Sequence, residues 1–77
     1  MVTGREPGHW YEIRVEGRLD ERWAARLPGF EIHPTDRDQT ALVAYITDQA
    51  ALFGALRLIR DLAIPLVLVR RLDGDEP

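Results

Sequence analysis

The sequence has 77 residues, 13 acidic and ten basic, and its formal net charge of −3 argues against generic nucleic-acid binding, which depends on neutralising phosphates. It contains no Cys, Ser or Lys, which excludes a serine or cysteine nucleophile, a Schiff-base lysine and a thiolate metal site. No stretch is apolar for long enough to cross a bilayer, and the first residues lack the apolar core of a signal peptide, so we expect one small cytoplasmic domain.

The amino-terminal part of the sequence predicts an arm followed by a strand. Residues 1–8 contain two glycines and a proline, and we expect them to form a flexible arm. From His9 onward apolar and polar residues alternate, which is typical of a strand with one buried face. The predicted buried side carries Tyr11, Ile13 and Val15, and the other side carries Trp10, Glu12, Arg14 and Glu16. Gly17 is expected to end this strand.

The middle of the chain predicts a short helix and two further strands. Residues 19–27 carry a large apolar side chain at every fourth position, which favours a helix of about two turns that ends before Pro28. Residues 30–33 alternate again and predict a short second strand. Residues 40–47 are rich in β-branched and aromatic side chains and predict a third strand.

The last two elements are the most clearly specified. The Asp48 carboxylate is suited to accept hydrogen bonds from the free amides of a first helical turn, and apolar residues then recur at spacings of three and four. Pro65 has no amide proton and disfavours helical geometry at Ile64, so we expect the helix to stop before Pro65. Residues 66–69 then predict a fourth strand that is apolar on both sides, and residues 73–77 an acidic tail.

The order of these elements predicts an α+β fold of the ferredoxin-like βαββαβ type, with a four-stranded antiparallel sheet and two helices on one face. The first and third strands would be central. The expected domain limits are an arm at residues 1–8, one domain at 9–72 and a tail at 73–77. An alternative is a four-stranded meander in which residues 19–27 form only an irregular turn and one long helix crosses the sheet.

In either arrangement the helices cover one face of the sheet and leave the other open. We expect Val67 and Val69 on the open face, with Trp10 from the first strand. The third strand adds either Val43 and Tyr45 or Leu42, Ala44 and Ile46, depending on its register. The charged side chains expected around them are Glu12, Arg14, Glu16, Glu31, His33 and Arg71.

Such a face would form an apolar patch larger than most monomers tolerate, so something is expected to cover it. The leading prediction is a non-enzymatic module that forms a homodimer, or binds a protein or a small ligand, through this face. The alternative is a small cofactor-free enzyme, isomerase-like or cyclase-like, in which His33 transfers a proton near neutral pH. The spacing of the two histidines predicts no metal site, and the sequence predicts no cofactor.

Four segments of the chain resemble a group of short, uncharacterised bacterial proteins from actinobacteria and other high-GC lineages. These proteins join a Tyr-Glu-Ile first strand to an Asp-Gln-Ala-Ala-Leu helix, which here correspond to residues 11–17 and 48–52, followed by residues 59–62 and 65–70. The resemblance spans Tyr11 to Leu72 and implies no activity and no catalytic residue.

Overall fold

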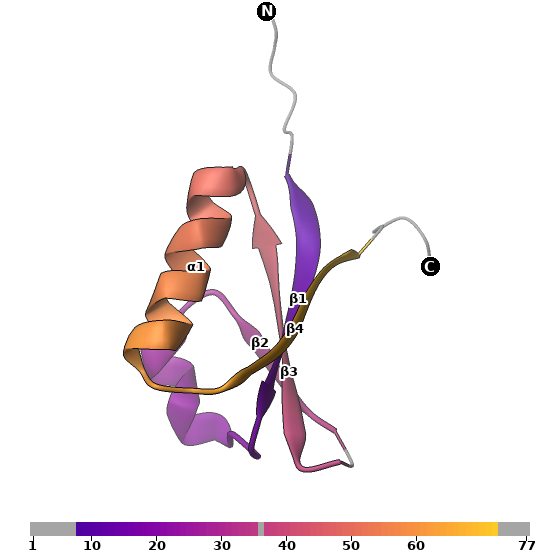
Figure 1. Ribbon diagram of the computed structural model, residues 1–77, viewed down its shortest axis with the longest axis vertical. Coiled ribbons are helices and arrows are strands. Elements are labelled where there is room, and N and C mark those ends of the chain that lie inside the picture. The colour runs from indigo at the N-terminus through magenta and orange to yellow at the C-terminus, as the bar shows by residue number, and fades with distance from the viewer. Residues whose placement is uncertain (1–7, 36, 73–77) are drawn as a thin grey trace, which may run out of the picture.

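The computed structural model describes residues 8–35 and 37–72, so the expected acidic tail and residues 1–7 of the expected arm lie outside the described residues. The architecture is α+β, as predicted. Its elements are β1 (His9–Glu16), η1 (Glu21–Arg26), β2 (Glu31–Pro34), β3 (Gln39–Ile46), α1 (Gln49–Asp61) and β4 (Leu66–Leu72). The strands form one antiparallel sheet in the order β2-β3-β1-β4, so β2 and β4 are its edges (Figure 1).

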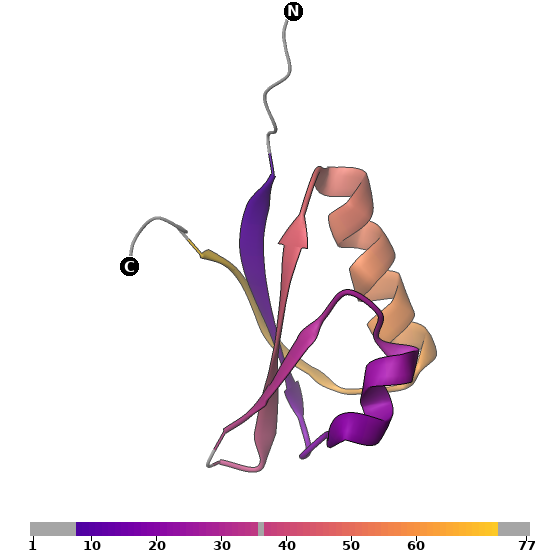
Figure 2. The same cartoon turned by 180° about the vertical axis from the view of Figure 1, so that it is seen from behind.

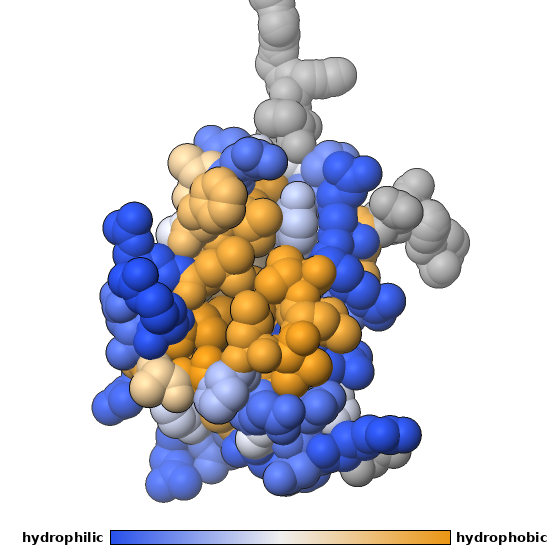
Figure 3. Space-filling view, in the orientation of Figure 1, coloured by the Kyte–Doolittle hydropathy of each residue, from blue (hydrophilic) through white to orange (hydrophobic). Residues whose placement is uncertain are grey.

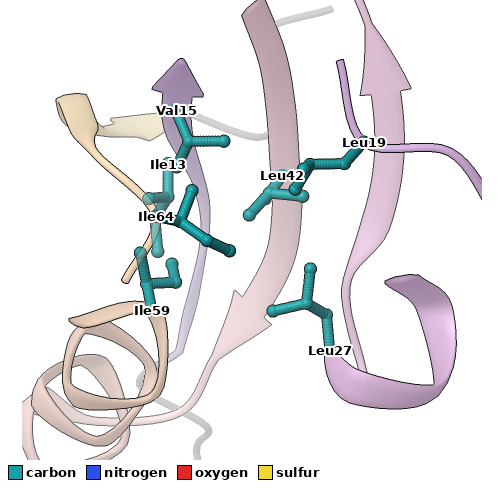
Figure 4. Packing of buried hydrophobic residues seen from close by; sticks show 7 residues of the cluster. All are labelled: Ile13, Val15, Leu19, Leu27, Leu42, Ile59 and Ile64. Atoms are coloured by element: carbon teal, nitrogen blue, oxygen red, sulfur yellow. The ribbon is translucent and has the colours of Figure 1, made fainter. Parts of the chain in front are cut away.

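The hydrophobic core lies between α1 and one face of the sheet, which we call the inner face. Ile13 of β1 and Leu42 of β3 are directly opposite each other and have no exposed surface. The side chains that complete the cluster are Val15, Leu19, Leu27, Ile59 and Ile64, which point toward one another from the sheet, the η1 segment and the α1 segment (Figure 4). The opposite side of the sheet, which α1 does not cover, is called the open face.

The pairing of β1 with β3 settles which residues of β3 reach the open face. Trp10 lies opposite Tyr45, and Glu12 lies opposite Val43. Because opposite residues of an antiparallel pair point to the same side of the sheet, Tyr45 and Val43 lie on the open face. The residues of β3 on the inner face are Thr40, Leu42, Ala44 and Ile46, all of them buried. Of the two registers that the sequence allows, the structure has the first.

The segment predicted as a first helix is a 3-10 helix, η1, of six residues, so the sheet is covered by one main helix (Figure 2). Asp20 caps it, and its Oδ1 accepts a hydrogen bond from the amide of Arg22 at 3.0 Å. A 3-10 helix rises about 2.0 Å per residue against about 1.5 Å for an α-helix, so it spans a given distance with fewer residues.

Helix α1 begins where the sequence predicts. Asp48 is its N-cap, with extended backbone angles, and its Oδ1 accepts a hydrogen bond from the amide of Ala51 at 2.8 Å. Only Ile59 is buried among the 13 residues of the helix, so most of its apolar residues are only partly covered or exposed. In the described part of the chain, no helix is long and apolar enough to cross a membrane.

Helix α1 ends before Pro65, as predicted, and its last residue is Asp61. Ala63 adopts a left-handed φ of 60°, and its amide donates a hydrogen bond to the carbonyl of Arg60 at 2.9 Å. The amide of Ile64 donates to the carbonyl of Ile59 at 3.2 Å. These two bonds form a Schellman motif, which satisfies the last helical carbonyls and is accompanied here by burial of both isoleucines. These capping bonds, which precede Pro65, end the helix at its C-cap, Leu62.

A buried threonine joins the loop after β1 to the centre of the sheet. Thr40 has no exposed surface, and its hydroxyl donates a hydrogen bond to the carbonyl of Gly17 at 2.7 Å. The same oxygen accepts a hydrogen bond from the amide of Leu19 at 2.9 Å. The Gly17 carbonyl and the Leu19 amide therefore both have a hydrogen-bond partner next to a fully buried side chain, as buried backbone groups require.

Candidate functional site

The side chains of β4 alternate in the phase opposite to the one expected. Val69 lies opposite Ile13 and packs against the core, and Arg71 lies opposite Tyr11, so both point to the inner side rather than to the open face. Leu68 and Arg70 take their place on the open face, opposite Arg14 and Glu12. Because residues 66–69 are apolar at every position, their hydrophobicity gives no information about the phase.

An irregularity at the start of β4 accounts for this shift. Val15 pairs with Leu66, whereas Arg14 pairs with Leu68, so Val67 is an extra residue in the strand, as in a β-bulge. Val67 is 38% exposed. The expectation that Val67 and Val69 form an apolar floor on the open face is therefore corrected: Val69 lies on the inner side and Val67 at the bulge.

The centre of the open face is occupied by a network of three charges, which we call the Arg-Glu-Arg triad: Arg14, Glu12 and Arg70. Oε2 of Glu12 accepts hydrogen bonds from Nε of Arg14 at 3.0 Å and from Nη2 at 2.6 Å. Oε1 accepts one from Nε of Arg70 at 2.8 Å. The side chain of Glu12 is only 6% exposed, against 32% for Arg14 and 61% for Arg70. The carboxylate is therefore enclosed, while both guanidinium groups reach solvent.

The environment of Glu12 stabilises its ionised form. Burial by itself would raise the pKa of this carboxyl, but the hydrogen bonds and charges of Arg14 and Arg70 lower it by more, so the pKa lies below the ordinary glutamate value. The triad therefore carries one negative and two positive charges and has an excess of one positive charge. Glu12 and Arg14 lie on the open face, as the sequence predicts. The sequence did not indicate the burial of Glu12 or its contact with Arg70.

Two exposed aromatic side chains adjoin the triad. Trp10 and Tyr45 are 40% and 44% exposed, and their ring centroids lie 5.6 Å apart with an interplanar angle of 68°, an edge-to-face arrangement. Gly8 lies against the Tyr45 ring so closely that a Cβ there would be 2.7 Å from the Tyr45 hydroxyl oxygen. The open face therefore presents an aromatic pair beside a positively charged group.

His33 is placed apart from the triad, on edge strand β2. Its Nε2 lies 3.0 Å from Oε1 of Glu31, and both side chains are more than half exposed. This is a solvent-facing pair without the enclosure that a general acid or base usually has. Within residues 8–35 and 37–72, no group of three or more His, Asp or Glu side chains is arranged to hold a metal ion.

The largest exposed apolar side chains outside the aromatic pair lie in β4 and α1. Leu66, Val67 and Leu68 are 52%, 38% and 37% exposed, and Phe53 is 60% exposed. Figure 3 shows hydrophobic surface gathered over α1 and β4. An apolar cleft of about 250 Å³ lies there, lined by Leu56, Ile59, Arg60, Ile64 and Leu66. We call β4 together with Phe53 and this cleft the β4 edge surface.

A second cleft, of about 450 Å³, lies between η1 and β2. It is lined by Leu19, Asp20, Glu21, Ala24, Phe30, Ile32 and Pro34. The Asp20 carboxylate at this cleft is already bound to the guanidinium of Arg22, with 3.1 Å between Oδ2 and Nη2. The cleft thus offers mainly apolar walls and lies on the opposite edge of the sheet from β4.

Comparison with known proteins gives a family without an assigned role. A family model described as "Domain of unknown function (DUF8691)" matches residues 10–70, which is most of the chain, so the protein belongs to this family. No curated protein and no solved structure matches the chain significantly.

Proposed function

We propose that this member of a family of unknown function is a non-enzymatic interaction module that associates with a second copy of itself along β4. The observation that carries the proposal is that β4 is an edge strand whose first three side chains are exposed and apolar. An edge strand presents unpaired backbone amides and carbonyls, which a strand from another chain can satisfy. The adjoining cleft and Phe53 extend the same surface onto α1.

The edge of the sheet supports association better than its open face does. The centre of the open face is the charged triad, with the Glu12 carboxylate enclosed and two guanidinium groups above it. Covering these guanidinium groups with the same groups of a second copy would remove like charges from water, which is costly. At the β4 edge surface residues 66–68 are apolar and exposed and gain by leaving water, and Arg70 and Arg71 lie toward the other end of the strand.

A second copy is a suitable occupant because β4 is complementary to itself. In an antiparallel pair centred on Val69, Leu68 lies opposite Arg70 of the partner subunit, and Leu66 lies opposite the partner's Leu72. No arginine then faces an arginine directly, and the aliphatic stem of each Arg70 can pack on a leucine. The middle of this pair, Leu68 to Arg70, lies in the part of β4 that pairs regularly with β1. A small core also gains from such support, since a domain of this length buries only about 60% of its unfolded surface.

The native mass of the protein tests this proposal. Light scattering over a wide concentration range is expected to show a concentration-dependent rise from the 8.8 kDa of one chain toward twice that mass. Val67→Lys places a charge at the edge and is expected to keep the chain monomeric. The matched control is Tyr45→Lys, at a site of similar exposure on the open face, which is expected to leave the mass unchanged.

The outcomes separate the edge from the face. A wild-type chain that stays monomeric at every concentration would overturn the proposal. Dissociation by Tyr45→Lys but not by Val67→Lys would instead assign the interface to the open face. Circular dichroism of each variant establishes that the fold is retained, which is expected because both substituted side chains are partly exposed.

We further infer a ferredoxin-like arrangement in which η1 stands where such folds have their first α-helix. The strand order β2-β3-β1-β4 and the connection of β1 to β2 through η1 support this. The bacterial and cytoplasmic assignments are proposals from the sequence, supported by the absence of cysteine and by a set of ten basic residues that are all arginine. Electron-density maps of a crystal would test the arrangement of η1 directly.

A further inference from the structure

We propose that the open face binds a small aromatic carboxylate, with Arg14 and Arg70 holding the carboxylate and Trp10 with Tyr45 contacting the ring. This site shares Arg70 with the β4 edge surface, but its other residues lie on β1 and β3, and the proposal does not depend on self-association. It rests on three features of the described residues: the excess positive charge of the triad, the exposure of its guanidinium groups, and the exposed aromatic pair beside it.

The geometry of the triad leaves donors for a ligand. Arg14 uses Nε and Nη2 on Glu12, and Arg70 uses Nε alone among its contacts with described residues. The remaining Nη groups belong to side chains that are 32% and 61% exposed. Glu12 holds both guanidinium groups close to the sheet, so less side-chain entropy is lost when a second carboxylate binds to them.

Charge selects a monoanion as the ligand. The triad has one positive charge in excess, which a single carboxylate neutralises, whereas a phosphate dianion would leave negative charge next to the Glu12 carboxylate. A guanidinium group also matches the planar geometry of a carboxylate. The positive charge is local to the triad, because Glu16 and Glu31 on the same face are acidic.

The aromatic pair selects the body of the ligand. Trp10 and Glu12 are two residues apart on the same side of β1, and Arg70 lies opposite Glu12 on the neighbouring strand. A ring attached directly to a carboxylate held by Arg70 is therefore directed along β1 toward Trp10, which packs on Tyr45 of β3, and aromatic contacts of this kind are favourable beyond simple burial. Benzoate is the smallest probe with both parts.

The test is a titration of the full chain with benzoate, followed by the indole N–H signals of Trp10 and Trp23 in nitrogen-15 correlation spectra. Trp23 lies in η1 between Arg22 and Arg26, so its signal reports whether any exposed ring beside arginine binds the probe. We expect a saturable shift of the Trp10 signal only. Benzamide, which has the same shape without the charge, is expected to bind about tenfold more weakly, because charge-assisted hydrogen bonds to arginine are lost. Inorganic phosphate at the same ionic strength is expected to be similarly weak.

Substitutions then assign the binding to the triad. Arg70→Gln is expected to weaken benzoate binding about tenfold, and Arg70→Lys to weaken it less because the charge remains. The matched control is Arg60→Gln, which removes another exposed arginine that pairs with a carboxylate, on α1, and is expected to leave binding unchanged. Retained amide dispersion in the Arg70 variants shows that they fold.

Several results would overturn the proposal: no shift of Trp10, equal shifts of Trp10 and Trp23, equal binding of benzoate and benzamide, or full binding by Arg70→Gln. Phosphate binding as tightly as benzoate would overturn the assignment of an aromatic ligand. Because the native mass is measured independently, a monomer that binds benzoate and a dimer that does not are both recognisable. Failure of this site is thus distinguishable from failure of the proposed association.

Discussion

Strands β3 and β4 differ in burial in a way that their sequences do not suggest. Both pair with β1, but β3 has five buried residues among its eight and β4 has none among its seven. β4 nevertheless begins with four consecutive apolar residues, whereas β3 begins with Gln39 and Thr40. The position of a strand in the sheet therefore decides its burial, and the edge strand keeps apolar surface that residues 8–35 and 37–72 do not cover.

Helix α1 shows the same contrast within one element. Ile59 is 2% exposed and belongs to the core, while Phe53 on the same helix is 60% exposed. The exposed apolar surface over α1 and β4 is thus a property of one side of the molecule rather than of a single residue. This side is the one on which an added chain would gain most, and the predictions below test the difference between it and the interior.

The largest expected difference is in the free energy of unfolding lost when a leucine of β3 or a leucine of β4 is replaced by alanine. Leu42→Ala removes a side chain with no exposed surface and is expected to lower the free energy of unfolding by about 2–5 kcal/mol. Leu68→Ala removes one that is 37% exposed and is expected to cost less than about 1 kcal/mol in dilute solution. Urea unfolding at low protein concentration measures both. Equal losses would mean that β3 and β4 are equally buried, against the comparison drawn above.

The second prediction concerns the buried hydroxyl of Thr40, which can be removed without changing the volume of the side chain. Thr40→Val keeps the shape of the side chain but leaves the amide of Leu19 and the carbonyl of Gly17 without their buried partner. We expect a loss of about 2–4 kcal/mol in the free energy of unfolding, because each unsatisfied buried group costs about 1–3 kcal/mol. Thr40→Ser retains the hydroxyl and is expected to keep most of the stability. If Thr40→Val leaves the free energy of unfolding unchanged, a water molecule takes the place of the hydroxyl.

The third prediction concerns the charged link between β1 and the edge strand. The pKa of Glu12 is lowered in the folded protein, so its contribution to stability is fully present above the ordinary glutamate pKa and is lost as the pH falls through the lower, folded value. Glu12→Gln is expected to cost about 1–2 kcal/mol near neutral pH, a value kept low because Arg70 is largely exposed. Its stability is also expected to vary less with pH below about 4 than that of the wild type.

Denaturant unfolding at several pH values measures this effect, and Glu31→Gln is the control because that carboxylate is exposed. If the wild type instead gains stability relative to Glu12→Gln as the pH falls, the effect of burial on the pKa of Glu12 outweighs that of the arginines. Hydrogen exchange of β4 amides in Glu12→Gln adds a local measurement. Faster exchange there than in β3 would confirm that the triad holds the edge strand in register.

The sequence predicts the regular parts of the fold because their patterns have one interpretation. The alternation in residues 9–16 placed Trp10, Glu12, Arg14 and Tyr11 on their observed sides, and Asp48 marked the start of α1. Where several conformations share one pattern, the sequence did not decide between them. Residues 19–27 fit an α-helix, but the helix that forms there is a 3-10 helix. The first four residues of β4 are all apolar, so they do not indicate which side chains face the core. The bulge at Val67, which depends on pairing with a distant strand, sets that phase.

The candidate site divides in the same way. His33, Glu12, Arg14, Trp10 and Tyr45 lie on the open face, as their alternation or one of the two registers implies. Arg70 joins Glu12 only because the phase of β4 differs from the expected one, and the triad is a contact between residues 58 apart in the sequence. Pairing over such a distance depends on the strand order and the register together, and neither can be read from one strand alone.

The smallest expected effect concerns the turn that leads from α1 into β4. Ala63 adopts φ of 60°, a conformation that costs a residue with a side chain about 1 kcal/mol more than glycine, and the Schellman motif usually has glycine at this position. Ala63→Gly is therefore expected to raise the free energy of unfolding by up to about 1 kcal/mol, partly offset by the greater freedom of glycine in the unfolded chain. Gly54→Ala on α1, where an added Cβ meets no atom within 4 Å, is the reciprocal control and is expected to stabilise the helix by a similar amount through propensity. If Ala63→Gly destabilises the protein, the left-handed residue is held by contacts of its methyl group rather than tolerated, and the path into the edge strand is more tightly specified than its exposure suggests.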